Sequence, residues 1–207
     1  MDFLFDIGRV LLNFDFETSL RKVATHDPDA SIAKLLDHKF EFETGSMSAT
    51  AFTHLACNTL GCDPDAFTSA WRDIFTPISP MWEDVRNLKS CGHRLILFSN
   101  TNAIHCPWIF GKFPEFSLFN ASVLSFEIGA MKPGQEIYHH AIRQFRLVPE
   151  RTLYIDDLPE NIATGRQLGF LSHCYDLNNH AAFRRWLDET LRENQSMLCD
   201  SSEPIPH

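Results

Sequence analysis

Short apolar runs alternate with segments of helical periodicity, and this alternation constrains the fold more than any other feature of the sequence. The runs are bounded by polar residues or glycine, as buried strands are. They cover residues 3–5, 94–98, 121–124, 152–155 and 170–174. Helical patterns lie between the later runs, at about 102–109, 136–145 and 161–168. The alternation predicts an α/β fold, a doubly wound parallel sheet with helices on both faces.

One long segment departs from this alternation. From residue 15 to residue 81 the periodicity is helical only, with glycine and proline marking the turns. We therefore predict a helical domain over 15–81, inserted into an α/β core made of 1–14 and 82–191. Residues 192–207 end in Ser-Ser-Glu-Pro-Ile-Pro-His and have no apolar period, so they are expected to form a disordered tail.

Bulk properties restrict the possible partners. A chain of 207 residues with a net charge of −9 lacks the basic character that nucleic acid binding requires. No apolar run is long enough to cross a bilayer and no signal peptide is evident, so we expect a cytoplasmic protein. The six cysteines form no metal-binding spacing and are expected to be free thiols. The oligomeric state is not predicted, and a monomer is compatible with the sequence.

Polar residues whose side chains could take part in catalysis or ligand binding follow the first two predicted strands. Asp6 comes directly after the first run, and Ser99-Asn100 ends the second. By itself a carboxylate here is more often a turn residue, and Ser or Asn is more often a helix cap. Because parallel strands end at one edge of a sheet, the same groups would also lie close together where ligands collect.

The later strands supply a cation and an acidic pair. Lys132 follows the third run, where a single lysine is usually solvated. Asp156 and Asp157 are adjacent and follow the buried run 153–155. Two carboxylates placed so closely repel one another, and a hard cation with oxygen ligands relieves that repulsion. A helix cap needs only one acid, so the pair favours a metal site.

The motifs, taken in order, resemble those of the haloacid dehalogenase-like hydrolase superfamily. They are Asp6-Ile7-Gly8, Ser99-Asn100, Lys132-Pro133 and Asp156-Asp157. The likeness covers residues 3–14 and about 95–170, and segments 98–105 and 155–162 are similar to the group of the bacterial α-D-glucose-1-phosphate phosphatase. The inserted segment is similar to the cap domain of that group. The resemblance implies a Rossmann-like core, a helical cap and a phosphatase.

The resemblance also implies roles for the strand-end residues. Asp6 would attack phosphorus and form an aspartyl phosphate. Ser99 and the backbone N–H of Asn100 would hold the phosphate oxygens. Lys132 would steady both the nucleophile and the phosphate. Such groups suit phosphoryl transfer, where catalysis is mainly positioning and charge neutralisation.

A magnesium ion is implied as the cofactor. Its ligands would be Asp6, the carbonyl oxygen of Gly8 and Asp157. Asp156 would be either a further ligand or a residue that contacts the ligands without touching the metal. The partner would be a small phosphorylated metabolite, such as a sugar phosphate, which the sequence does not identify.

One position departs from the superfamily pattern. Most of its phosphatases have a second aspartate two residues after the nucleophile, as general acid and base, whereas this chain has Gly8. The proton donor would then be solvent or a cap residue, or the leaving group would need none. His105 is a candidate acid, although a histidine packed at the start of a helix is the commoner case.

Two other functions compete with a phosphatase. A metal-free dehalogenase would share the aspartate nucleophile but has no use for Asp156 and Asp157 facing a metal. A non-catalytic binding or regulatory protein on the same fold would explain Gly8, but it would not need the other motifs to be intact. Assays with and without magnesium would separate the three.

Overall fold

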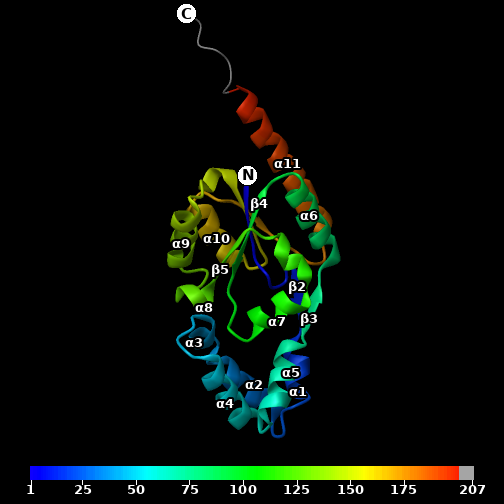
Figure 1. Ribbon diagram of the computed structural model, residues 1–207, viewed down its shortest axis with the longest axis vertical. Coiled ribbons are helices and arrows are strands. Elements are labelled where there is room, and N and C mark those ends of the chain that lie inside the picture. The colour runs from blue at the N-terminus through cyan, green and yellow to red at the C-terminus, as the bar shows by residue number, and fades with distance from the viewer. Residues whose placement is uncertain (201–207) are drawn as a thin grey trace, which may run out of the picture.

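The centre of the protein is a five-stranded sheet in the order β5-β4-β1-β6-β7, in which every neighbouring pair is parallel (Figure 1). The computed structural model describes residues 1–200. The strands are β1 (Asp2–Phe5), β4 (Arg94–Ser99), β5 (Ala121–Leu124), β6 (Thr152–Asp156) and β7 (Leu171–Cys174). They coincide with the five predicted runs, and the predicted α/β fold class is confirmed.

Helices cover both faces of the sheet, because side chains along each strand alternate between them. Phe3 and Phe5 of β1 enter one core and Leu4 enters the other. The first core is completed by α6 (Ser79–Ser90), α7 (His105–Lys112) and α11 (His180–Asp200). The second is completed by α9 (Gln135–Phe145) and α10 (Pro159–Gln167). Short helices α8 (Ser125–Ile128), η1 (Pro114–Leu118) and η2 (Pro149–Arg151) connect these elements.

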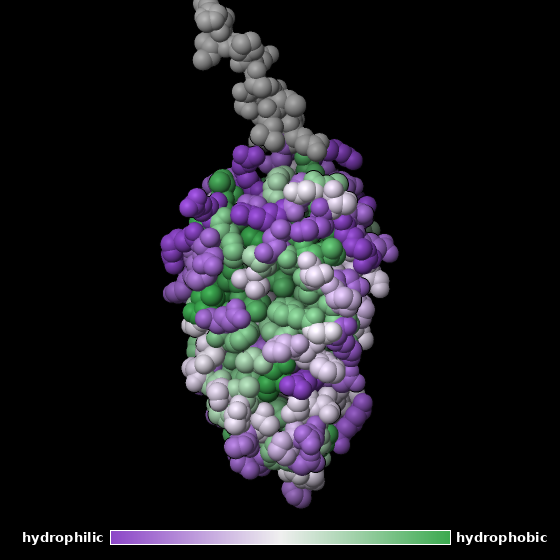
Figure 2. All heavy atoms as spheres, viewed as in Figure 1, coloured by the Kyte–Doolittle hydropathy of each residue, from purple (hydrophilic) through white to green (hydrophobic). Residues whose placement is uncertain are grey.

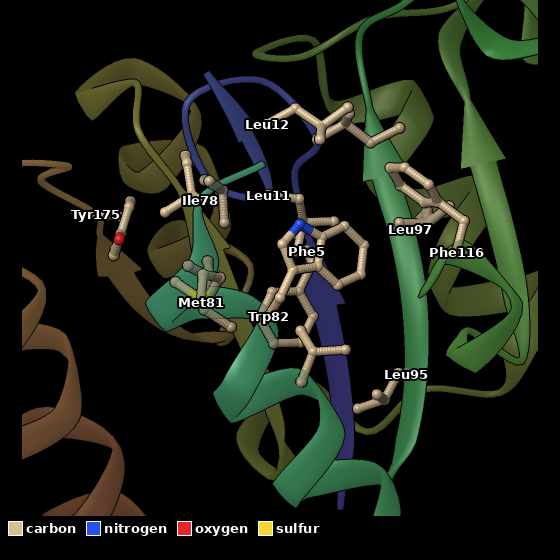
Figure 3. Packing of buried hydrophobic residues seen from close by; sticks show 14 of the residues in the cluster. Phe5, Leu11, Leu12, Ile78, Met81, Trp82, Leu95, Leu97, Phe116 and Tyr175 are labelled. Atoms are coloured by element: carbon tan, nitrogen blue, oxygen red, sulfur yellow. The ribbon is translucent and has the colours of Figure 1, made fainter. Parts of the chain in front are cut away.

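Aromatic packing fixes helix α6 on the sheet (Figure 3). Trp82 is buried, and its ring meets that of Phe116 edge to face at 5.1 Å between centroids. Phe5 and Met81 are fully buried in the same cluster. Figure 2 shows hydrophobic residues gathered over the middle of the visible face, between hydrophilic residues of the upper core and of the lower tip.

Between β1 and α6 the chain forms five helices with a hydrophobic core of their own, at the lower end of Figure 1. We call this part the cap. It consists of α1 (Phe16–Arg21), α2 (Pro28–Leu36), α3 (Lys39–Glu43), α4 (Ala49–Leu60) and α5 (Pro64–Arg72). In its core Phe42 stacks on Phe52 with ring centroids 4.0 Å apart. An antiparallel pair, β2 (Leu12–Phe14) with β3 (Phe75–Pro77), joins the cap to the sheet domain.

Two parts of the structure differ from the expectations. The pair β2–β3 was not predicted, because strands of three residues are too short to show a period. Helix α11 continues to Asp200, so the expected disordered tail does not begin at residue 192. Apolar residues of this helix, such as Phe183 and Leu187, pack on the sheet and anchor it. Residues 201–207 of that tail lie outside the described residues, and the predicted domain boundaries stay predictions.

Within residues 1–200, no helix combines the length and the apolar character that crossing a membrane requires.

The turn after α3 docks the cap onto the sheet domain. Gly45 has φ +73°, and a Cβ at this position would clash with the backbone oxygen of Phe126 in α8. Glycine is therefore required both by the left-handed backbone and by the close approach. This contact fixes the C-terminal end of α3 relative to the sheet.

We expect Gly45→Ala to destabilise the protein more than Gly92→Ala does. Gly92 has a similar φ of +79°, but a Cβ there meets nothing within 4 Å. The control variant therefore reports only the cost of placing alanine in the left-handed conformation, which is about 1–2 kcal/mol. The free energy of unfolding, measured in urea, should fall by at least about 1 kcal/mol more for Gly45→Ala. Equal losses would mean that the cap does not press on Phe126.

Candidate active site

The predicted site residues meet at the carboxyl ends of β1, β4 and β6. The chain passes from β1 to β4 and β5 on one side and returns to β6 on the other, so β1 lies at a topological switch point. Ligands in such sheets bind beyond the strand ends at this point. A cavity of about 420 Å³ lies there. Its lining includes all but one of the predicted site residues: Asp6, Gly8, Ser99, Asn100, Lys132 and Asp157.

Lys132 is the cation of the site and is 2% exposed. Its Nζ donates to Asp6 Oδ1 at 3.0 Å, to Asp156 Oδ2 at 2.5 Å and to the Phe98 carbonyl oxygen at 2.7 Å. Burial alone would lower the pKa of Lys132, but the carboxylates of Asp156 and Asp6 outweigh it and raise that pKa. The ammonium group is therefore charged and aligned with the Asp6 carboxylate.

Asp156 is fully buried behind the cavity. Besides Lys132, its oxygens accept from the Tyr154 hydroxyl at 2.6 Å, the Leu158 N–H at 2.9 Å and Asn161 Nδ2 at 2.9 Å. Burial raises the pKa of Asp156, but the Lys132 charge and these donors outweigh it, so the pKa is lowered. Both oxygens are occupied, which favours a positioning role for this carboxylate.

The adjacent acid, Asp157, is partly exposed to the cavity and suits a cation ligand. One carboxylate oxygen each of Asp6, Asp156 and Asp157 lies within 4.8 Å of the others. Burial, with the charges of Asp6 and Asp156, raises the pKa of Asp157 to about 7. Burial also raises the pKa of Asp6, against the opposing effect of Lys132. Three acids with one buried ammonium form an oxygen-rich, negatively charged site that fits a hard divalent cation.

The loop after β4 is fixed by side-chain bonds. Asn100 Nδ2 donates to the Lys132 carbonyl oxygen, and Asn100 Oδ1 accepts from the Lys132 N–H, both at 2.8 Å. Ser99 ends the buried strand β4. Helix α7 starts later than predicted, at His105, and the Asn102 Oδ1 in the turn before it accepts from the N–H groups of Ile104 and His105. Ser99 therefore does not cap α7, and its side chain belongs to the lining of the cavity.

His105 lines the cavity but is not available as an acid. Its Nε2 donates to the Trp71 carbonyl oxygen at 2.9 Å, and its Nδ1 accepts from Asn102 Nδ2 at 3.1 Å. The ring also stacks on Trp71, with centroids 5.0 Å apart. Burial lowers the pKa of His105 to about 4. The imidazole is therefore neutral near pH 7 and serves packing, the commoner of the two roles considered from the sequence.

The cap contributes a residue that the sequence analysis did not select. Glu43, at the end of α3, lines the cavity and is 9% exposed. Its Oε1 lies 3.7 Å from Lys39 Nζ, while its Oε2 is buried and has no hydrogen-bond partner. The only signal for it was a charged residue between the apolar Phe42 and the required Gly45.

Residues 68–169 match the family described as haloacid dehalogenase-like hydrolase. D-ribitol-5-phosphate phosphatase from Bacteroides thetaiotaomicron is 28% identical over 183 residues, which cover 81% of this chain and 87% of that protein. A sesquiterpene phosphatase from Aspergillus oryzae is 23% identical over 175 residues, covering 81% and 86%.

Solved structures of this fold are similar. A HAD family enzyme from Bacteroides thetaiotaomicron, in complex with magnesium and inorganic phosphate, has a TM-score of 0.76 at 23% identity and covers 85% of this chain and 94% of its own. A predicted HAD-like family hydrolase from Porphyromonas gingivalis has a TM-score of 0.73 at 28% identity, covering 90% and 97%.

We expect Lys132→Met to destabilise the protein by about 3–5 kcal/mol at pH 7, because it leaves the carboxylates of Asp6 and Asp156 buried without their cation. Lys112→Met is the matched control, since Lys112 pairs with the exposed Asp73 on the surface. That change should cost less than about 1 kcal/mol. Urea denaturation measures both. Similar losses for the two variants would show that Lys132 does not neutralise buried acids.

Proposed function

We propose that this chain is a haloacid dehalogenase-like hydrolase, a magnesium-dependent phosphatase that acts on a small phosphomonoester through an aspartyl phosphate at Asp6. The observation that carries the proposal is the Asp6 carboxylate at the end of β1, 3.0 Å from a buried lysine ammonium and beside Asp157. A nucleophile, a fixed positive charge and an oxygen-rich cation site are the groups that phosphoryl transfer requires.

Magnesium fits the acidic cluster. Asp6, the carbonyl oxygen of Gly8 and Asp157 would hold the ion, while Asp156 keeps Lys132 in place. The similar enzyme solved with magnesium and inorganic phosphate supports this assignment. When bound, the ion supplies charge neutralisation for the phosphoryl group.

The remaining groups bind and orient the phosphate. A carboxylate oxygen of Asp6 attacks phosphorus, and Lys132 attracts the phosphate oxygens while it holds that carboxylate. The Ser99 hydroxyl and the N–H of Asn100 donate to the other oxygens. Attack forms the aspartyl phosphate, and water then hydrolyses it to inorganic phosphate.

The substrate we propose is a small phosphorylated metabolite, with sugar and sugar-alcohol phosphates as the first class to test. The similarity to D-ribitol-5-phosphate phosphatase supports this class. The cavity also has aromatic walls formed by Phe14, Phe16, Trp71 and Phe75, so apolar alcohols belong in the same screen. A cytoplasmic location stays part of the proposal.

The alternatives have less support. Similar dehalogenase folds have a TM-score of 0.60 at 14% identity and indicate the fold alone. The Asp157 carboxylate, whose pKa is raised beside two other acids, has no evident purpose without a cation. A non-catalytic protein would not need a buried lysine aligned with Asp6.

We expect hydrolysis of p-nitrophenyl phosphate to stop in excess chelator and to return with magnesium. Asp157→Asn should raise the magnesium concentration that gives half-maximal activity by at least about tenfold, because a neutral amide is a poorer ligand for a hard cation. Asp188→Asn, an exposed acid on α11, is the control and should leave it unchanged. Full activity in chelator would contradict the metal assignment.

Asp6→Asn should lower turnover by more than about a thousandfold, because the amide keeps the shape but is no nucleophile. Calorimetry should still detect inorganic phosphate binding to this variant in magnesium. If Asp6→Asn keeps substantial turnover, the nucleophile is another residue.

A further inference from the structure

The site lacks an acid where the superfamily usually has one, and the structure shows why. A Cβ at Gly8 would lie 3.0 Å from the Phe14 ring, tighter than ordinary packing allows. For a larger residue to fit here, that ring, which belongs to the β2–β3 connection between sheet and cap, would have to yield by a few tenths of an ångström. The proton for an alcohol leaving group therefore comes from elsewhere.

Of the other groups that line the cavity, one is a candidate for the proton donor. Asp6 and Asp157 have the roles proposed above, and Lys132 is held between two carboxylates. His105 has both ring nitrogens bonded. The two other cationic side chains that line the cavity are exposed to solvent. Among the described residues, Glu43 is the lining acid that has no other assignment.

Glu43 is held in place by the cap. Lys39, one turn earlier on α3, lies near its Oε1, and Phe42 beside it is fixed by stacking on Phe52. Gly45, two residues later, presses on the sheet domain at Phe126. These contacts keep Glu43 in the wall of the cavity that Asp6 also lines, and its Oε2 is buried there without a hydrogen-bond partner. A buried carboxyl oxygen without a partner is costly, and a bound substrate oxygen would relieve it.

We propose that Glu43 is the general acid and base of this enzyme, taking the place of the aspartate that Gly8 replaces. The inference rests on the proposed function. As Asp6 attacks phosphorus, the bond from phosphorus to the leaving oxygen breaks, and that oxygen takes the Glu43 proton to become an alcohol. The Glu43 carboxylate then removes a proton from water, whose oxygen attacks the aspartyl phosphate. The electron pair of the broken bond returns to Asp6, and Glu43 is protonated again.

The electrostatics of the cavity agree with this role. Burial raises the pKa of the Glu43 carboxyl to about 7, with Lys39 and Lys132 opposing and Asp6 adding to the rise. General acid–base catalysis is most efficient when the pKa lies near the operating pH.

The test compares two aromatic esters of similar size, p-nitrophenyl phosphate and benzyl phosphate, in magnesium. The p-nitrophenolate ion leaves without a proton, whereas benzyl alcohol requires one. Glu43→Gln should lower kcat/KM for benzyl phosphate by about 10²–10⁴-fold and for p-nitrophenyl phosphate by less than about tenfold. The variant should also show a burst of p-nitrophenol, because the amide cannot activate water against the aspartyl phosphate.

Glu41→Gln is the control, since Glu41 is exposed on the same helix and its change should leave both esters unaffected. Thermal unfolding should show that Glu43→Gln, an isosteric change, keeps the fold. An equal fall for both esters, or no fall for benzyl phosphate, would overturn the inference while leaving the phosphatase assignment intact. If the unaltered protein hydrolyses neither ester, the proposed function itself fails.

Discussion

The ammonium group of Lys132, held between the carboxylates of Asp6 and Asp156, is the interaction on which the rest of the site depends. Three strands meet in it: β1 places Asp6, β6 places Asp156, and the Phe98 carbonyl of β4 accepts the third hydrogen bond. Burying one such charge is costly, and pairing offsets much of that cost only when the geometry is good. The parallel sheet supplies that geometry, because its strand ends lie side by side.

Much of the fold could be predicted because strands buried on both faces form unbroken apolar runs. All five strands of the main sheet were found in this way. The pair β2–β3 was not, since Leu12–Phe14 and Phe75–Pro77 gain their partners only when distant segments meet. The predicted start of α7 is too early because four consecutive residues, 99–102, are all capable of capping a helix, whereas in the structure the helix begins at His105, after a turn in which Asn102 accepts from Ile104 and His105.

The site residues likewise include some that could be predicted from the sequence and some that could not. Asp6 and Asp157 could be chosen from the sequence, because each directly follows a strand that the topology brings to one edge. Lys132 lies beyond α8, and its backbone is held at this edge by the Asn100 side chain. Glu43 could not be chosen in this way, since its place in the wall of the cavity that Asp6 also lines depends on how the cap docks through Gly45. In the sequence it resembles a surface residue paired with Lys39 at i, i+4. His105 is the converse, a tempting residue whose ring nitrogens the fold has already used.

An acid carried by the cap has a consequence that an acid on β1 would not have. At the usual position the proton donor would remain beside the nucleophile whether the cap is open or closed. Glu43 contributes only while the turn at Gly45 rests on α8, the arrangement that also covers the cavity. Covering a site restricts water and strengthens its electrostatic interactions. Proton transfer to the leaving alcohol is thereby tied to cap docking. The Phe14 ring lies where a side chain at Gly8 would extend, and it packs on Phe75 in the β2–β3 connection between the sheet domain and the cap.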